Sequence, residues 1–139
     1  MTQMSQDEKM AFLADLHVGV LGLNDPGRGP LTVPIWYDYT PGGELWMVTG
    51  ANSRKGKLLE AGTRVSLAAQ TEQAPYRYVS VEGVVSSIEP TDAKTLTDMA
   101  IRYLGEAQGT AYAAGSDLTG QVTVRVKPER WLAVDYSRT

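Results

Sequence analysis

The sequence predicts a mainly β protein with a few helices, in which six or seven antiparallel strands close into a small barrel. The chain has 139 residues, the size of one domain with one core, and no internal repeat or long linker divides residues 1–139. Clusters of turn formers separate short β-branched and aromatic runs, which is typical of strands joined by hairpins rather than by crossover helices. An eight-stranded sandwich of the same length fits this pattern as well.

A short helix is predicted at the start of the chain. Ser5 and Glu8 have the spacing of a capping box. Apolar residues follow at helical spacing, namely Met10, Phe12, Leu13 and Leu16.

The strands are predicted from β-branched and aromatic runs that end at clusters of Gly, Pro, Asn and Asp. The longest run alternates from Tyr78 onward, as a strand with one buried face does. The predicted strands are 17–23, 31–39, 44–49, 64–70, 76–89, 122–126 and 131–136.

Two further helices are predicted. Asn52 or Ser53 is expected to cap a short helix, and Gly62 suits a left-handed conformation at its C-terminal end. A longer one follows Thr91 and ends at Gly105, with an apolar stripe made of Leu96, Met99, Ala100, Tyr103 and Leu104. The segment 105–120 is rich in Gly and Ala, reads as either a loop or a broken helix, and is expected to be the least ordered part of the chain or a lid.

Composition excludes several classes of function. The chain has no cysteine and a single histidine, His17, so disulfides, thiolate nucleophiles and multi-histidine zinc sites are impossible. His17 has no obvious carboxylate partner, which favours a structural role. A net charge of -3 argues against a general nucleic-acid binder. No apolar run is long enough for a membrane span, and Met1–Lys9 carries no export signal, so we expect a cytoplasmic protein with no membrane partner.

A basic cluster is the first candidate site. Four basic residues fall between positions 52 and 64, where Glu60 is the only acid: Arg54, Lys55, Lys57 and Arg64. The cluster follows a strand that ends at Thr49 and Gly50, and the hydroxyls of Thr49 and Ser53 add donors for a phosphate or carboxylate at a helix start. The alternative is a solvated helix face.

The segment from Val33 to Tyr37 is the second candidate. Pro34 within a strand predicts an edge or a bulge, because its missing N–H is not needed there. Backbone groups at such a bulge could border a flat ring, together with Ile35 and Trp36. The alternative is an edge strand whose Trp36 packs in the core or a dimer interface.

The order of these segments resembles the pyridoxamine 5'-phosphate oxidase-like family of FMN-binding split barrels. The residues that carry the resemblance are Trp46–Thr49, Gly50–Leu58, Thr63–Leu67, Arg77–Gly83 and Val33–Trp36. Within that family, the strand of Pro34 to Tyr37 and the aromatic segment 75–78 look most like the flavin and deazaflavin oxidoreductases of the B type. Genuine pyridoxamine 5'-phosphate oxidases end in an Arg and His motif, and this chain ends 131–139 without histidine, so oxidation of vitamin B6 is not expected.

The resemblance implies an antiparallel split β-barrel of Greek-key type and a homodimer with two cofactor sites at the subunit interface. It implies coenzyme F-420, an 8-hydroxy-5-deazaflavin, or FMN as the cofactor, and hydride transfer to a small conjugated acceptor; a protein that only binds the cofactor is the alternative. The implied cofactor-binding residues are Val33, Pro34, Ile35, Trp36, Thr49, Gly50, Ser53, Arg54, Lys55, Lys57, Arg77 and Tyr78. Thr49, Ser53, Arg54 and Lys55 would hold its phosphate. No proton donor is identified, although water or a tyrosine at position 76 or 78 of a partner subunit could serve.

Overall fold

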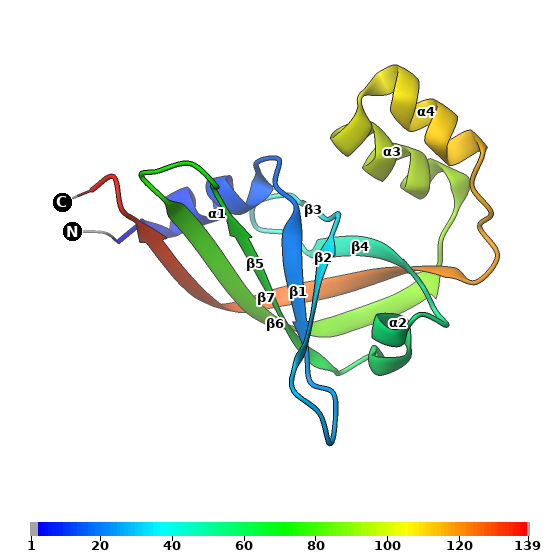
Figure 1. Ribbon diagram of the computed structural model, residues 1–139, viewed down its shortest axis with the longest axis horizontal. Helices are drawn as coiled ribbons and strands as arrows, with labels where there is room; N and C mark the ends of the chain where they lie inside the picture. Colours follow the sequence, from blue (N-terminus) through cyan, green and yellow to red (C-terminus); the bar gives the residue numbers. More distant parts are fainter. Residues whose placement is uncertain (1–2, 139) are drawn as a thin grey trace.

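The structure, a computed structural model, describes residues 3–138 as one curved antiparallel sheet with four helices around it (Figure 1). The strand order is β2-β1-β5-β6-β7-β4-β3. The strands are β1 (Gly19–Leu23), β2 (Leu31–Ile35), β3 (Asp38–Tyr39), β4 (Leu45–Gly50), β5 (Arg64–Gln70), β6 (Arg77–Pro90) and β7 (Gln121–Asp135). The helices are α1 (Gln6–Ala14), α2 (Arg54–Leu58), α3 (Ala93–Leu104) and α4 (Glu106–Ala114).

The two edges of this sheet are joined by only two residues. β2 lies at one end of the strand order and β3 at the other, and Trp36 with Tyr37 connects them. The chain itself therefore holds the edges together, as in a barrel that is split where Trp36 lies. This confirms the predicted antiparallel split β-barrel of six or seven strands, with seven strands present.

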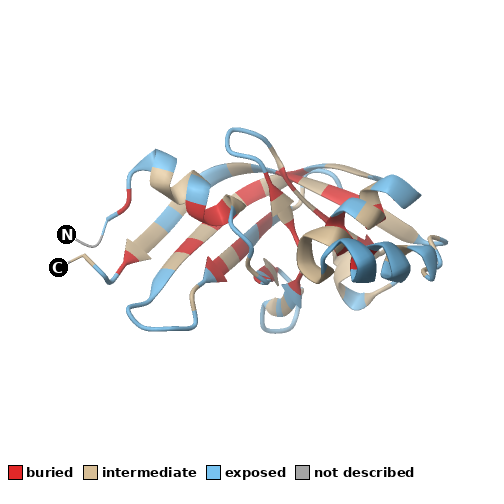
Figure 2. Cartoon of the chain, turned by 90° about the horizontal axis from the view of Figure 1, so that it is seen from above, coloured by how far each residue is buried: buried red, intermediate tan, exposed pale blue. Residues whose placement is uncertain are grey.

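The core lies inside the curve of the sheet, where one side of each strand is buried (Figure 2). Leu21, Leu67 and Val81 are directly paired across three neighbouring strands and are almost fully buried. Alternation along a strand then sends their neighbours to the outer face. Pro34 lies on the edge strand β2, as its missing N–H predicts.

Two strand predictions need correction. The predicted strands 122–126 and 131–136 are one strand, β7, because β6 and β7 stay paired through a bulge opposite the Glu82/Gly83 step. The bulge accommodates Pro128, and a Cβ on Gly83 would collide with the carbonyl oxygen of Lys127. The predicted strand 31–39 is in turn broken at Trp36, where the chain crosses from one sheet edge to the other.

The helix predictions hold with changes at the ends. Ser5 and Glu8 form the predicted capping box of α1, but the helix ends at Ala14 and Leu16 lies beyond it, exposed. The end of α2 is Leu59 in an extended conformation. Gly62, at φ +92°, lies instead in the turn before β5.

The ambiguous segment 105–120 contains a regular helix, α4, and a loop that follows it from Gly115 to Gly120. Gly105, at φ +85°, ends α3 and immediately precedes α4. Gly109 does not break α4 but lets it approach α3 closely, because a Cβ there would lie 2.5 Å from the Cα of Ile101. Tight packing on α3 thus stabilises a segment with little apolar periodicity of its own.

Across residues 3–138, no helix is both long and apolar enough to cross a membrane.

The two ends of the described chain are held together by Glu8 and Arg138. The guanidinium of Arg138 donates to the carboxylate of Glu8, and with the Ser5 cap it lowers the pKa of Glu8 from 4.5 to about 2. A lowered pKa in the folded state means stability that is complete above pH 4.5 and is lost as the pH falls toward 2. We therefore expect Glu8→Gln to reduce the dependence of urea unfolding on pH between 4.5 and 2. If the free energy of unfolding fell equally with pH in the wild type and the variant, this prediction would be wrong.

Candidate functional site

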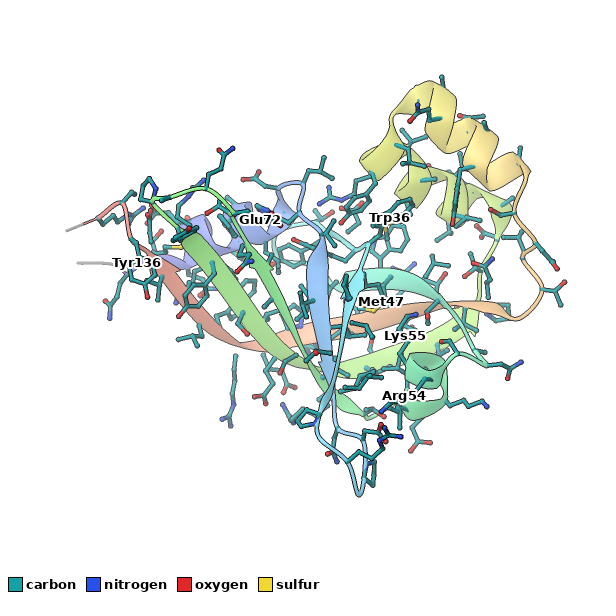
Figure 3. The ribbon with its side chains drawn as sticks, in the orientation of Figure 1. Trp36, Met47, Arg54, Lys55, Glu72 and Tyr136 are labelled. Atoms are coloured by element: carbon teal, nitrogen blue, oxygen red, sulfur yellow. The ribbon has the colours of Figure 1, made fainter. Side chains whose placement is uncertain are left out.

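A cavity of about 390 Å³ opens beside the split in the barrel. Its walls come from segments that are far apart in the sequence, and they bring together several residues that the sequence singled out. Pro34, Ile35 and Trp36 form one wall, and Thr49, Gly50 and Lys55 form another. In Figure 3, Trp36 lies toward the α3–α4 pair and Lys55 toward α2. The complete lining is Val18, Pro34, Ile35, Trp36, Val48, Thr49, Gly50, Lys55, Tyr112 and Gln121.

Thr49 lines this cavity and has a buried, unpaired hydroxyl. The residue is 5% exposed, and its Oγ1 has no hydrogen-bond partner within the part of the chain that the structure describes. A buried hydroxyl without a partner costs free energy, on the order of 1–3 kcal/mol. A polar ligand group that reaches this hydroxyl would remove that cost, which makes Thr49 a candidate ligand contact.

Lys55 supplies a positive charge at the same place. Lys55 lines the cavity, and among residues 3–138 no carboxylate forms an ion pair with its ammonium group. Arg54 differs, because its Nη2 lies 2.6 Å from Oδ2 of Asp25 in the β1–β2 turn. Lys55 is thus the basic-cluster residue that the fold aims into the cavity, and Arg54 fastens α2 to that turn.

Local hydrogen bonds fix the segment that carries Lys55. The hydroxyl of Ser53 donates to the carbonyl of Gly50 at 2.7 Å and accepts from the N–H of Gly56 at 3.1 Å. Its proton is therefore used within the turn. Gly56 packs so closely on the end of β4 that a Cβ there would collide with the carbonyl oxygen of Gly50. These contacts hold Lys55 beside Thr49.

The Trp36 side of the cavity is held by α3. The ring of Trp36 stacks on that of Tyr103, with centroids 4.9 Å apart and planes 4° apart. Burial raises the pKa of Tyr103, so its hydroxyl stays protonated. That hydroxyl accepts from the N–H of Tyr37 at 3.0 Å, and its one proton has two carbonyl oxygens in reach, that of His17 at 2.5 Å and that of Tyr37 at 2.9 Å. Tyr103 therefore fixes both the backbone beside Trp36 and the indole itself.

Six predicted site residues lie outside the cavity lining: Ser53 and Arg54, described above, and Val33, Lys57, Arg77 and Tyr78. Val33 alternates with Pro34 and packs against the core, and Lys57 is exposed on α2. Arg77 places its guanidinium 5.2 Å from the centre of the Phe12 ring, near the termini. Tyr78 lies on the outer face of the sheet, beside a second hollow of about 600 Å³.

His17 packs against α1. Its ring stacks on Phe12 with centroids 4.5 Å apart, and desolvation lowers its pKa. The residue lines the second hollow rather than the cavity with Thr49 and Lys55.

Sequence reasoning missed four lining residues, Val18, Val48, Tyr112 and Gln121. Val48 directly precedes Thr49, so it could have been inferred with that strand. Tyr112 and Gln121 carry no local signal, because only the pairing of β7 with β4 and the packing of α4 on α3 bring them to the cavity.

Comparisons with known structures agree with this architecture. An F420 reductase is 21% identical and superimposes with a TM-score of 0.70 over 88% of this chain and 94% of its own. A FAD-binding protein from Mesorhizobium loti is 23% identical, with a TM-score of 0.69 over 95% of both chains. A conserved hypothetical protein from Mycobacterium tuberculosis is 26% identical, with a TM-score of 0.74 over 97% of this chain and 87% of its own.

A search of curated proteins gives no match. The family model described as pyridoxamine 5'-phosphate oxidase matches residues 5–135, which is nearly the whole chain. The split barrel, the neighbours of the same fold and this match confirm the resemblance seen in the sequence. The chain belongs to the pyridoxamine 5'-phosphate oxidase family.

Proposed function

We propose that this protein is an oxidoreductase in which reduced coenzyme F-420 provides a hydride to a small conjugated acceptor. The observation that carries the proposal is the cavity that combines the unpaired Thr49 hydroxyl, the Lys55 ammonium and the wall of Pro34 to Trp36. A long ligand with an anionic part and a flat ring matches those groups. Family membership and the flavin- and deazaflavin-related neighbours support a flavin-type cofactor.

Each wall has a separate task in this proposal. Lys55 attracts an anionic group of the cofactor, and the Thr49 hydroxyl donates a hydrogen bond to it. The backbone of Pro34, Ile35 and Trp36 borders the ring and excludes water from one side. When bound, the reduced deazaflavin supplies the hydride, and the protein supplies binding and orientation.

Titration of the apo-protein with F-420 and with FMN tests the proposal. We expect F-420 to bind more tightly, as followed by its fluorescence. When an enone, quinone or tetrapyrrole is added, the reduced F-420 bound to the protein should be oxidised. Tighter binding of FMN would favour an FMN enzyme of the same fold, and tight F-420 binding without turnover would favour a carrier protein.

We propose further that the protein is a homodimer joined through the outer face of the sheet. One row of residues crosses five strands in direct register: Pro34, Val20, Ala68, Ser80 and Leu132. Val20 is 42% and Leu132 61% exposed, although both are apolar. Val18 and Pro34 line both the cavity and the hollow on this face, so a second copy seated here would also cover the open side of the cavity.

Replacing Val20 with glutamate is expected to produce a monomer, because it places a charge in the middle of an apolar interface. Light scattering of the wild type at micromolar concentration should give twice the monomer mass. Lys94→Glu, on the exposed side of α3, changes the charge more strongly and should leave the mass unchanged. A wild-type monomer would overturn the proposed dimer. Within its own chain, Trp36 packs against α3 and α4.

A further inference from the structure

The α3–α4 pair contributes an aromatic side chain that no sequence motif indicated. Tyr112 of α4 lines the same cavity as Thr49 and Lys55. Its ring lies 5.7 Å from that of Trp36, inclined by 54°, and the residue is 50% exposed. An aromatic residue left half open at a cavity has a ring surface available to a ligand.

The position of Tyr112 is fixed from two directions. Gly109 allows the backbone of α4 to contact α3, and Tyr112 follows one turn later on the same face of the helix. Trp36, which faces it, is held in turn by its stack on Tyr103. The two rings therefore form a prepared wall rather than a mobile flap.

This wall lies apart from the polar part of the cavity. Lys55 lies on the side of α2, whereas Trp36 lies on the side of α3 and α4 (Figure 3). If an anionic cofactor is held at Lys55, the aromatic wall remains beside its ring, where the acceptor must approach. Because the two rings are inclined by 54°, a planar acceptor that stacks on one of them meets the other with its edge, and an acceptor of two or more fused rings is wide enough to contact both.

We infer that Trp36 and Tyr112 form the acceptor subsite and select planar conjugated acceptors of two or more fused rings. The inference rests on the proposed function and adds the class of acceptor to it. Tyr112 acts here as a specificity-determining residue that contacts the acceptor, while Lys55 and Thr49 contact the cofactor.

The test uses full-length protein loaded with oxidised F-420, in which no hydride can be transferred. The dissociation constant of 1,4-naphthoquinone is measured by calorimetry, and steady-state rates with reduced F-420 follow for naphthoquinone and for 2-cyclohexenone. We expect Tyr112→Leu to raise the naphthoquinone dissociation constant about five- to tenfold, the loss of one aromatic contact. The KM for naphthoquinone should rise by a similar factor, and the KM for cyclohexenone should stay within about twofold.

Two variants serve as controls. Tyr112→Phe keeps the ring and should bind naphthoquinone like the wild type. Tyr136→Leu removes an equally exposed tyrosine near the C-terminus, far from the cavity in Figure 3, and should also have no effect.

The outcomes separate the inference from the proposed function. If wild-type protein binds no F-420, the proposed function is wrong and the inference falls with it. If F-420 binds but Tyr112→Leu leaves naphthoquinone binding unchanged, only the inference is wrong. An equal loss of affinity for F-420 in Tyr112→Leu would likewise overturn it, because Tyr112 would then contact the cofactor.

Discussion

Replacing Lys55 with alanine is expected to weaken F-420 binding by about ten- to a hundredfold. Lys55 lines the cavity without an ion-pair partner among residues 3–138, beside the buried Thr49 hydroxyl. A charge-assisted hydrogen bond in such a site contributes roughly 1.5–3 kcal/mol, and each 1.4 kcal/mol is a factor of about ten in affinity. Equilibrium titration followed by F-420 fluorescence measures the change.

Three further variants make this prediction specific. Lys57→Ala removes an exposed charge from the same helix, and Lys94→Ala removes one from α3; both should change affinity less than about twofold. Arg54→Ala should weaken binding less than Lys55→Ala, because Asp25 already neutralises part of its charge. Wild-type affinity in the Lys55→Ala variant would remove the main support for the cofactor site.

Thr49→Val supplies an independent check on the same cavity. Valine keeps the shape of threonine and removes the unpaired hydroxyl, so the apo-protein should lose no stability while its affinity for F-420 falls. If the hydroxyl were only structural, Thr49→Val would lower the stability of the apo-protein and leave its affinity for F-420 unchanged.

Much of the fold could be predicted because its signals are local. Turn formers at 24–30 and 40–43 bound the strands on either side of them, and Pro34 marked an edge. The break at Trp36 and the bulge near Pro128 were missed, since both depend on how the sheet closes on itself rather than on nearby residues. The regular helix α4 depends in the same way on close packing of Gly109 against α3.

The site was predictable to the extent that its residues are adjacent in the sequence. Thr49, Gly50 and Lys55 follow one another along the chain and do line the cavity. Arg54 belongs to the same run, but a distant partner, Asp25, determines the direction of its side chain. Tyr112 reaches the cavity only through the packing of two helices, which no spacing in the sequence encodes.

The α3 helix is attached to the barrel through Arg102, and this attachment can be tested by mutation. The Arg102 guanidinium donates to the carbonyl oxygens of Tyr37, Ala14 and Asp15, at distances of 2.9–3.1 Å. It also lies 3.2 Å from a carboxylate oxygen of Asp38. One side chain, 18% exposed, thus connects the end of α1, the link between β2 and β3, and α3.

Arg102→Met is therefore expected to destabilise the protein by about 3 kcal/mol, because three carbonyl groups each lose a hydrogen bond to a charged donor while the apolar stem of the side chain is kept. For a domain of this size that corresponds to a fall of roughly 10 °C in Tm, measured by circular dichroism. Arg102→Lys should lie in between, since an ammonium cannot reach the three carbonyls as a fork. Lys94→Met on the same helix removes only an exposed i,i+4 pair and should leave Tm unchanged. Tyr103 and Trp36 stack directly beside this attachment. Arg102→Met should therefore also weaken naphthoquinone binding at 20 °C, where the variant is still folded. A large loss of Tm with unchanged naphthoquinone binding would show that the position of the Trp36 and Tyr112 rings does not depend on α3.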